Sequence, residues 1–162
     1  MNTRESAAGG GLRIGVISDT HGLLRPEALA ALQGSDHIIH AGDVGAPEIL
    51  DRLRAIAPTV AVRGNVDTAP WAMALPLHDV LVVGEVHIYV THGHHALGFE
   101  PATAGFAAVI SGHSHTPTIE QRGGVLFLNP GSAGPRRFTL PVTVARLVVD
   151  GTTLHAEIIE LH

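Results

Sequence analysis

Five apolar, β-prone runs of this sequence each end in a loop that carries aspartate, histidine or asparagine. The runs are Leu12–Ile17, His37–Ala41, Thr59–Val62, His87–Val90 and Ala107–Ile110. The loops after them contain, in order, Asp19-Thr20-His21, Gly42-Asp43, Gly64-Asn65, Thr91-His92-Gly93-His94 and Gly112-His113-Ser114-His115. Open α/β sheets place their chemistry outside the carboxyl ends of their strands. The sequence therefore predicts one site assembled from five strand ends.

The side chains in these loops are the oxygen and nitrogen ligands that suit hard and borderline divalent metals. Asp19 and His21 lie two residues apart, as do His113 and His115, so each pair can point to one side of its strand end. Seven ligands are too many for one tetrahedral ion but suit two ions that share a bridging carboxylate. Taken singly, Asp43 could cap a helix, Gly64-Asn65 could be a turn, and the histidines could be ordinary polar residues.

The composition indicates a compact globular chain. Of 162 residues, 45% are hydrophobic and 15% are charged, which argues against disorder. We expect a disordered N-terminal tail at residues 1–11 and one domain at residues 12–162. The chain has no cysteine, which excludes disulfides and thiolate zinc sites and fits a cytoplasmic location. No apolar stretch approaches the ~20 residues of a membrane span. The net charge of −5 provides no positive electrostatic field that would attract long nucleic acid.

The order of the apolar runs predicts an α/β chain whose two halves differ. The first half alternates strands with helices that begin at Pro26 and at Pro47, the second of which ends near Ile56. The second half is β-rich and has one short helix, at Phe99–Phe106. Its predicted strands are Val80–Val83, Val86–Val90, Val109–Ser111, Thr118–Gln121, Val125–Leu128, Val142–Val149 and Thr153–Ile159. We expect two sheets packed face to face with helices outside.

Together, the five ordered motifs resemble the signature of the calcineurin-like metallophosphoesterases. The short chain resembles their small bacterial and archaeal phosphodiesterase branch. Two of its segments are also similar to sequence motifs of that branch, namely Ile17-Ser18-Asp19-Thr20-His21 and Asn129-Pro130-Gly131-Ser132. The resemblance covers most of residues 12–160. It implies a four-layer α/β/β/α sandwich of two mixed β-sheets flanked by helices, with the site between the carboxyl ends of the strands.

The resemblance also implies roles for the motif residues. Asp19, His21 and His115 would hold one divalent ion. Asn65, His92 and His113 would hold a second, and Asp43 would bridge both. A hydroxide between the ions would attack the phosphorus of a small phosphoester. Manganese is the first expectation for the metal, with nickel, iron or zinc as alternatives. Relatives suggest a homodimer or homotetramer.

One motif departs from the pattern of larger superfamily members. They carry a histidine after the asparagine, credited with protonating the leaving group, whereas this chain reads Gly64-Asn65-Val66-Asp67. The small branch commonly lacks that histidine too. His94 and His95 are the nearest replacements in sequence, and we expect His94 to act as a phosphate contact or proton donor. With Asn65 and Asp43 it completes the predicted catalytic set. The change favours phosphodiesters, or good leaving groups, over difficult monoesters.

Three other function classes stay open at this point. The chain could be a phosphomonoesterase that acts on a small metabolite. It could be a metal-binding regulator without turnover, or a protein-binding scaffold like the retromer subunit of this fold, whose metal site is altered. All seven ligand positions are intact here, which counts against the scaffold.

Several residues near the motifs carry weaker expectations. His40 lies in an apolar run and is expected to be a buried partner of the site rather than a ligand. Asp67 could orient a ligand or stabilise its own turn. The sequence does not decide the roles of Ser132, Arg136-Arg137, Trp71 and Met73. Surface or structural positions are expected for the histidines outside the motifs, namely His37, His78, His87 and His155.

Overall fold

The computed structural model describes residues 11–162, so the tail expected at residues 1–11 lies outside the described residues except for Gly11. In chain order the elements are β1 (Leu12–Ile17), α1 (Pro26–Leu32), β2 (His37–His40), α2 (Pro47–Arg54), β3 (Thr59–Ala61), the 3₁₀ helix η1 (Pro70–Ala74), β4 (His78–Val83), β5 (Val86–Thr91), β6 (Ala108–Ile110), β7 (Thr118–Arg122), β8 (Val125–Asn129), β9 (Thr143–Asp150) and β10 (Thr153–Glu160).

These strands form two mixed sheets. The first has the order β10-β9-β1-β2-β3, in which β1, β2 and β3 are parallel. The second has the order β4-β5-β6-β8-β7, in which β5, β6 and β8 are parallel. Antiparallel strands complete both sheets, with β9 and β10 in the first and β4 and β7 in the second. The five strands that precede the candidate ligands therefore run parallel within their own sheet.

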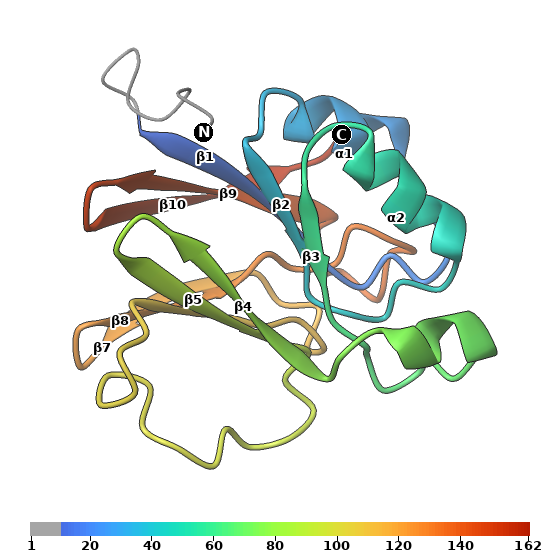
Figure 1. Ribbon diagram of the computed structural model, residues 1–162. Helices are drawn as coiled ribbons and strands as arrows, with labels where there is room; N and C mark the ends of the chain where they lie inside the picture. The colour runs from blue at the N-terminus through green and yellow to red at the C-terminus, as the bar shows by residue number, and fades with distance from the viewer. Residues whose placement is uncertain (1–10) are drawn as a thin grey trace.

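The two sheets pack face to face around one apolar core (Figure 1). Val16 and Ile39 of the first sheet and Ile88 and Ile110 of the second are fully buried there. Helices α1 and α2 cover the outer face of the first sheet, and each begins with a proline in its first turn. Helix α2 buries Ile49, Leu50 and Leu53 against that sheet. The predicted α/β architecture of two mixed sheets with flanking helices is confirmed.

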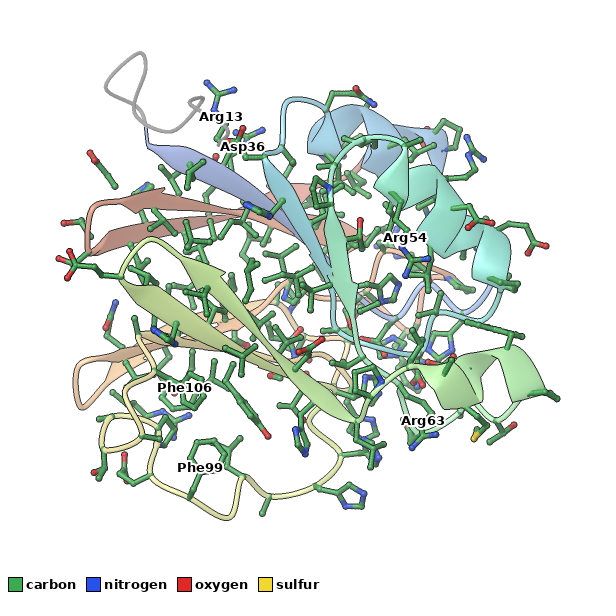
Figure 2. The ribbon with its side chains drawn as sticks, in the orientation of Figure 1. Arg13, Asp36, Arg54, Arg63, Phe99 and Phe106 are labelled. Atoms are coloured by element: carbon green, nitrogen blue, oxygen red, sulfur yellow. The ribbon has the colours of Figure 1, made fainter. Side chains whose placement is uncertain are left out.

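The outer face of the second sheet is covered by the segment 92–107, drawn in yellow below β4 and β5 in Figure 1. The helix predicted at Phe99–Phe106 is wrong, because this stretch forms turns. Its backbone hydrogen bonds span four, three and five residues, from Ala104 to Glu100, from Gly105 to Ala102 and from Phe106 to Pro101. They therefore lack the regular four-residue spacing of an α-helix. Figure 2 shows Phe99 and Phe106 on this segment, and both rings contact Tyr89 of β5.

The structure separates the two apolar residues of η1 that the sequence left open. Trp71 is half-buried and packs against the core beneath α1 and α2. Met73 is 51% exposed, and its sulfur accepts a hydrogen bond from Arg63 at 3.1 Å. Among the helices that the structure describes, none is long and apolar enough to cross a bilayer.

Candidate metal centre

The carboxyl ends of β1, β2, β3, β5 and β6 bring the seven predicted ligands together. Among the described residues, two groups have ligand atoms close enough to hold a metal ion. The first consists of Asp19, His21 and His115, and the second of Asp43, His92 and His113. Asn65 joins the second group through its amide oxygen. The clustering that the strand ends predicted is therefore what the structure contains.

The first group is held close by short nitrogen–oxygen distances. Oδ1 of Asp19 lies 3.4 Å from Nε2 of His115 and 3.7 Å from Nε2 of His21. The two Nε2 atoms are 3.3 Å apart. Asp19 and His115 are buried, whereas His21 is half-buried. Three potential ligand atoms of three side chains thus surround one point.

The second group is tighter. Oδ2 of Asp43 lies 3.1 Å from Nε2 of His92. Oδ1 of Asn65 lies 3.0 Å from the same nitrogen and 3.2 Å from Nδ1 of His113. Oδ2 of Asp43 also lies 3.7 Å from Nε2 of His21 in the first group. Asp43 therefore stands between the two groups, where a bridging carboxylate would be needed.

Hydrogen bonds fix which atoms face the centre. Oδ2 of Asp19 accepts from the Ser18 hydroxyl at 2.7 Å and from the His113 backbone N–H at 3.0 Å. Its Oδ1 is buried and, within the described part of the chain, has no hydrogen-bond partner. A buried acceptor of this kind is costly unless a cation or a donor satisfies it. Asp19 thus offers one fixed oxygen to the centre.

His92 is also oriented by a hydrogen bond that leaves one ring nitrogen facing the centre. Its Nδ1 donates to the carbonyl of Ala41 at 2.7 Å, so Nε2 of the neutral ring presents a lone pair to two acceptors, Oδ2 of Asp43 and Oδ1 of Asn65. Three acceptors meet where only a proton or a metal cation can satisfy them. The donor set therefore fits divalent metal ions, by its chemistry and by the free oxygen of Asp19.

Asp43 and His92 shift each other's pKa values. Burial acts to raise the pKa of Asp43, but hydrogen bonds from His92 and from the Val66 N–H outweigh it and hold that pKa below its ordinary value. Burial acts to lower the pKa of His92, but its bonds to Asp43 and Ala41 raise it above the ordinary value. Both shifts favour a full negative charge on Asp43 paired with a cation at Nε2 of His92.

The backbone at the centre is strained. Six non-glycine residues in the described part of the chain have positive φ, and five of them are candidate ligands, namely Asp19, His21, Asp43, His113 and His115. Each such conformation costs roughly 1–3 kcal/mol and persists where the surroundings enforce it, commonly at functional sites. This signal is independent of the identity of the side chains, and the sequence did not reveal it.

His94 lies at the edge of the centre rather than within it. Its ring centroid is 5.4 Å from that of His92 and 6.1 Å from that of His113. Its Nδ1 is buried without a hydrogen-bond partner among residues 11–162. Burial lowers the pKa of His94, and the neighbouring His95, His92 and His113 lower it further.

Residues 12–152 match the model of the calcineurin-like phosphoesterase superfamily domain. The chain belongs to this superfamily. A probable metallophosphoesterase of Methanocaldococcus jannaschii is 40% identical over 148 residues, which cover 82% of this chain and 73% of that protein. Phosphodiesterase YfcE of Escherichia coli K12 is 31% identical over 153 residues, which cover 75% and 79%. Vps29 of Chaetomium thermophilum has the same fold, with a TM-score of 0.75 at 21% identity over 93% and 97% of the two chains.

Asp67 ties two loops of this superfamily domain together. Its Oδ2 accepts from the backbone N–H of Gly64 at 2.9 Å and from that of Val44 at 3.2 Å. Its Oδ1 accepts from the N–H of Gly45 at 3.2 Å. Asp67 therefore stabilises its own turn, which is one of the two roles that the sequence left open, and it also fixes the loop that carries Asp43.

The turn at residues 129–132 supports the loops of the centre through hydrogen bonds, which the sequence indicated only in part. Nδ2 of Asn129 donates to the Gly112 carbonyl at 2.9 Å and to the Ser114 hydroxyl at 3.1 Å, so it shapes the turn that carries His113 and His115. The Ser132 hydroxyl donates to the Asp19 carbonyl at 3.0 Å. Sequence reasoning missed the role of Asn129. The exposed Arg137 lies close enough to His115 to contribute to the lowering of its pKa, after burial.

His40 joins the loops of Asp19 and Asp43 without facing the centre. Its Nδ1 accepts from the Gly42 N–H at 3.1 Å. Because the Thr20 hydroxyl donates to the Val44 carbonyl at 2.7 Å, that oxygen accepts from Nε2 of His40 at 3.0 Å. The neutral ring is therefore fully satisfied. Burial, followed by the proximity of His92, lowers the pKa of His40 from 6.5 to about 3.

This pKa predicts acid sensitivity of the metal-free protein. The folded pKa lies below the unfolded one, so the unfolded state binds more protons between pH 6.5 and about 3. The contribution of His40 is fully present above pH 6.5 and is lost as the pH falls toward 3. Between pH 7.5 and pH 4.5 it amounts to roughly 3 kcal/mol of the unfolding free energy.

The measurement is urea unfolding at both pH values with a chelator present. His40→Asn is expected to lower stability at pH 7.5, because the bond to Thr20 is lost, and to reduce the loss of stability on acidification by roughly 3 kcal/mol. An unchanged difference between the two pH values in this variant would contradict the assignment.

Proposed function

We propose that this protein hydrolyses phosphoesters in a metal-dependent reaction, and phosphodiesters before monoesters. The observation that carries the proposal is the convergence of ligand atoms around two adjacent points, with the buried carboxylate of Asp43 between them. Membership of the calcineurin-like superfamily supports it, as does the similarity to a relative named phosphodiesterase.

In this proposal Asp19, His21 and His115 hold one divalent ion, while Asn65, His92 and His113 hold the other. Asp43 bridges them, as its position between the two groups suggests. When bound, two such ions supply a hydroxide for in-line attack on phosphorus and neutralise charge on the phosphate oxygens. Manganese is the metal we propose first, and nickel, iron and zinc suit the same ligands. We also propose cytoplasmic action as a dimer or tetramer.

The protein residues hold this arrangement rigid before any substrate arrives. Asp19 keeps one oxygen occupied by Ser18 and by the His113 backbone, so only Oδ1 can turn toward the centre. His92 is fixed by Ala41, and the loop of Asp43 is fixed by Asp67. Such outer contacts orient ligands and commonly matter 10–100-fold for metal affinity or activity, in order of magnitude.

The preference for phosphodiesters rests on Val66. Its side chain is 55% exposed and has no ionisable proton to donate, whereas the superfamily resemblance described above associates this position with a histidine in larger members. Its backbone N–H instead donates to Oδ1 of Asp43 at 3.0 Å. Without a proton donor there, leaving groups of low basicity react more readily. We propose that His94 contacts the phosphate or donates the proton, because it is the imidazole beside both His92 and His113.

Restoration of activity by metal tests the function as a whole. The purified protein is stripped with a chelator, dialysed, and reconstituted with manganese, nickel or zinc. Hydrolysis of bis(4-nitrophenyl) phosphate is then followed by absorbance, and bound metal by mass spectrometry. We expect two metal equivalents and restored hydrolysis, with slower turnover of an alkyl phosphomonoester. Metal uptake without hydrolysis of either ester would indicate a regulator, and neither uptake nor hydrolysis would indicate a scaffold.

Asp43→Asn is expected to lower kcat/KM by about 100-fold or more, because it removes the charge shared by both groups, beyond the 10–100-fold typical of an outer contact. Bound metal should also fall below two equivalents. The matched control is Asp79→Asn, which changes an exposed aspartate of β4 and should leave both quantities unchanged. A wild-type rate with two bound ions in Asp43→Asn would refute the bridging role.

His94→Ala is expected to lower kcat about 10- to 100-fold while metal content stays at the wild-type value, because the ring contacts substrate and not metal. The control is His87→Ala, an exposed histidine on the same strand as Thr91, for which we expect an unchanged rate. Full activity of His94→Ala would remove this residue from the site, and a large loss in His87→Ala would show that the motif assignment is wrong.

A further inference from the structure

A cavity of about 260 Å³ opens beside the candidate metal centre. Its walls come from the start of β4, the end of β5 and the segment after His92. They include Leu77, His78, Tyr89, Thr91, His94 and Leu97. The function proposed above leaves this cavity without a role.

The cavity adjoins the ligands through His94. This residue lines the cavity on one side, and its ring centroid lies 5.4 Å from that of His92 on the other. Thr91, which also lines the cavity, directly precedes His92 in sequence. A phosphate held at the metal centre would therefore have one substituent within reach of this cavity.

The walls are planar and held in place. The ring of His78 stacks on Tyr89, with centroids 5.7 Å apart and an interplanar angle of 24°. Behind Tyr89, the rings of Phe99 and Phe106 contact it at 5.0 Å and 5.2 Å, and Figure 2 shows both on the segment below the sheet. His94 and His95 form a second pair of rings, 4.2 Å apart. Aromatic walls of this kind favour a planar ring over an aliphatic chain.

The lining carries no formal charge when its histidines are neutral, as far as the described residues go. Burial raises the pKa of Tyr89, so its hydroxyl also stays neutral at physiological pH. A second phosphate or a carboxylate would find no cationic arginine or lysine here to neutralise it. Polar groups are nevertheless available, since the lining includes the polar side chains of Tyr89, Thr91 and His95. The cavity thus suits a group that is uncharged but able to form a hydrogen bond.

The volume of the cavity further limits the kind of group that it can bind. A cavity of about 150 Å³ already holds benzene, and pockets for drug-sized molecules begin at about 300 Å³. The volume of about 260 Å³ therefore suits one ring system and excludes a chain of nucleotides.

We propose that this cavity binds an uncharged planar ring attached to the phosphate that the metal centre holds, so that the protein prefers esters with an aryl group or a single nucleobase. This inference rests on the proposed function, because it assumes that phosphate binds at the metal centre. His78, Tyr89 and Leu97 then determine specificity, while the metal ligands do not distinguish one phosphoester from another.

Equilibrium binding of phosphonates tests the cavity without turnover, because their P–C bond is not hydrolysed. The manganese-loaded protein is titrated calorimetrically with ethylphosphonate, benzylphosphonate and a thymidine 5′-phosphonate. Stacking predicts that at least one ring-bearing probe binds about 3- to 10-fold more tightly than ethylphosphonate. The two ring arms separate an aryl preference from a nucleobase preference. Amide chemical shifts of residues 77, 78 and 97 should move with that probe and not with ethylphosphonate.

Two variants change lining residues from different segments, β4 and the segment after His92. Leu97→Trp fills the cavity, and His78→Ala removes the ring that stacks on Tyr89. Both are expected to abolish the ring preference while the Kd for ethylphosphonate changes less than about twofold. The matched control is Ile119→Trp, an equally bulky change at a 44%-exposed residue on the opposite edge strand, β7, which should keep the wild-type preference.

The outcomes separate the two proposals. If all three phosphonates bind equally, or if Leu97→Trp and His78→Ala keep the ring preference, the cavity is not the subsite, although the metal-dependent function stands. If metal is taken up but ethylphosphonate does not bind, or if no metal is taken up, the proposed function fails and this inference fails with it.

Discussion

The structure depends on a set of acceptor atoms that face one another, of which those of Asp19 and Asp43 belong to buried residues and that of Asn65 to an exposed one. Oδ1 of Asp19, Oδ2 of Asp43 and Oδ1 of Asn65 point toward histidine nitrogens whose own protons, in the case of His92, are already donated elsewhere. Such a cluster is unfavourable in isolation, because each buried acceptor loses its water. A positive charge removes the conflict at every member at once. The positions of these acceptor atoms are fixed by the two sheets, by their parallel strands and by the hydrogen bonds around the centre.

Parallel pairing explains how residues as far apart as Asp19 and His115 meet. Because β1, β2 and β3 run parallel, as do β5 and β6, their carboxyl ends lie at one edge of each sheet, and face-to-face packing brings the two edges together. Five candidate ligands have left-handed backbone and lie within two to five residues of the end of the preceding strand. Rigid strands therefore position the ligands, although every ligand itself lies in a loop or at a strand boundary.

Much of this arrangement could be predicted from the sequence, because apolar periodicity locates strands and the ligand residues follow them at fixed places. The seven candidate ligands and the buried position of His40 emerged in this way. The helix expected at Phe99–Phe106 was wrong, since its local pattern does not show that Phe99 and Phe106 pack on Tyr89 in a turn-rich segment. The roles of Ser18 and Asn129, and the cavity beside His94, depend on contacts between distant residues. Such contacts leave no local signal.

The glycines that precede the ligands limit how this centre can change. A Cβ on Gly64 would collide with the backbone and carboxylate of Asp43, and one on Gly112 would collide with the Ser18 hydroxyl and the Asp19 carboxylate. A Cβ on Gly42 would meet the His92 ring at 2.6 Å. These three positions are closed to every larger amino acid, so random mutagenesis aimed at the metal shell would yield mostly inactive chains. A library intended to change substrate choice is better confined to the rim, where residues 77–78 and 95–97 line the cavity.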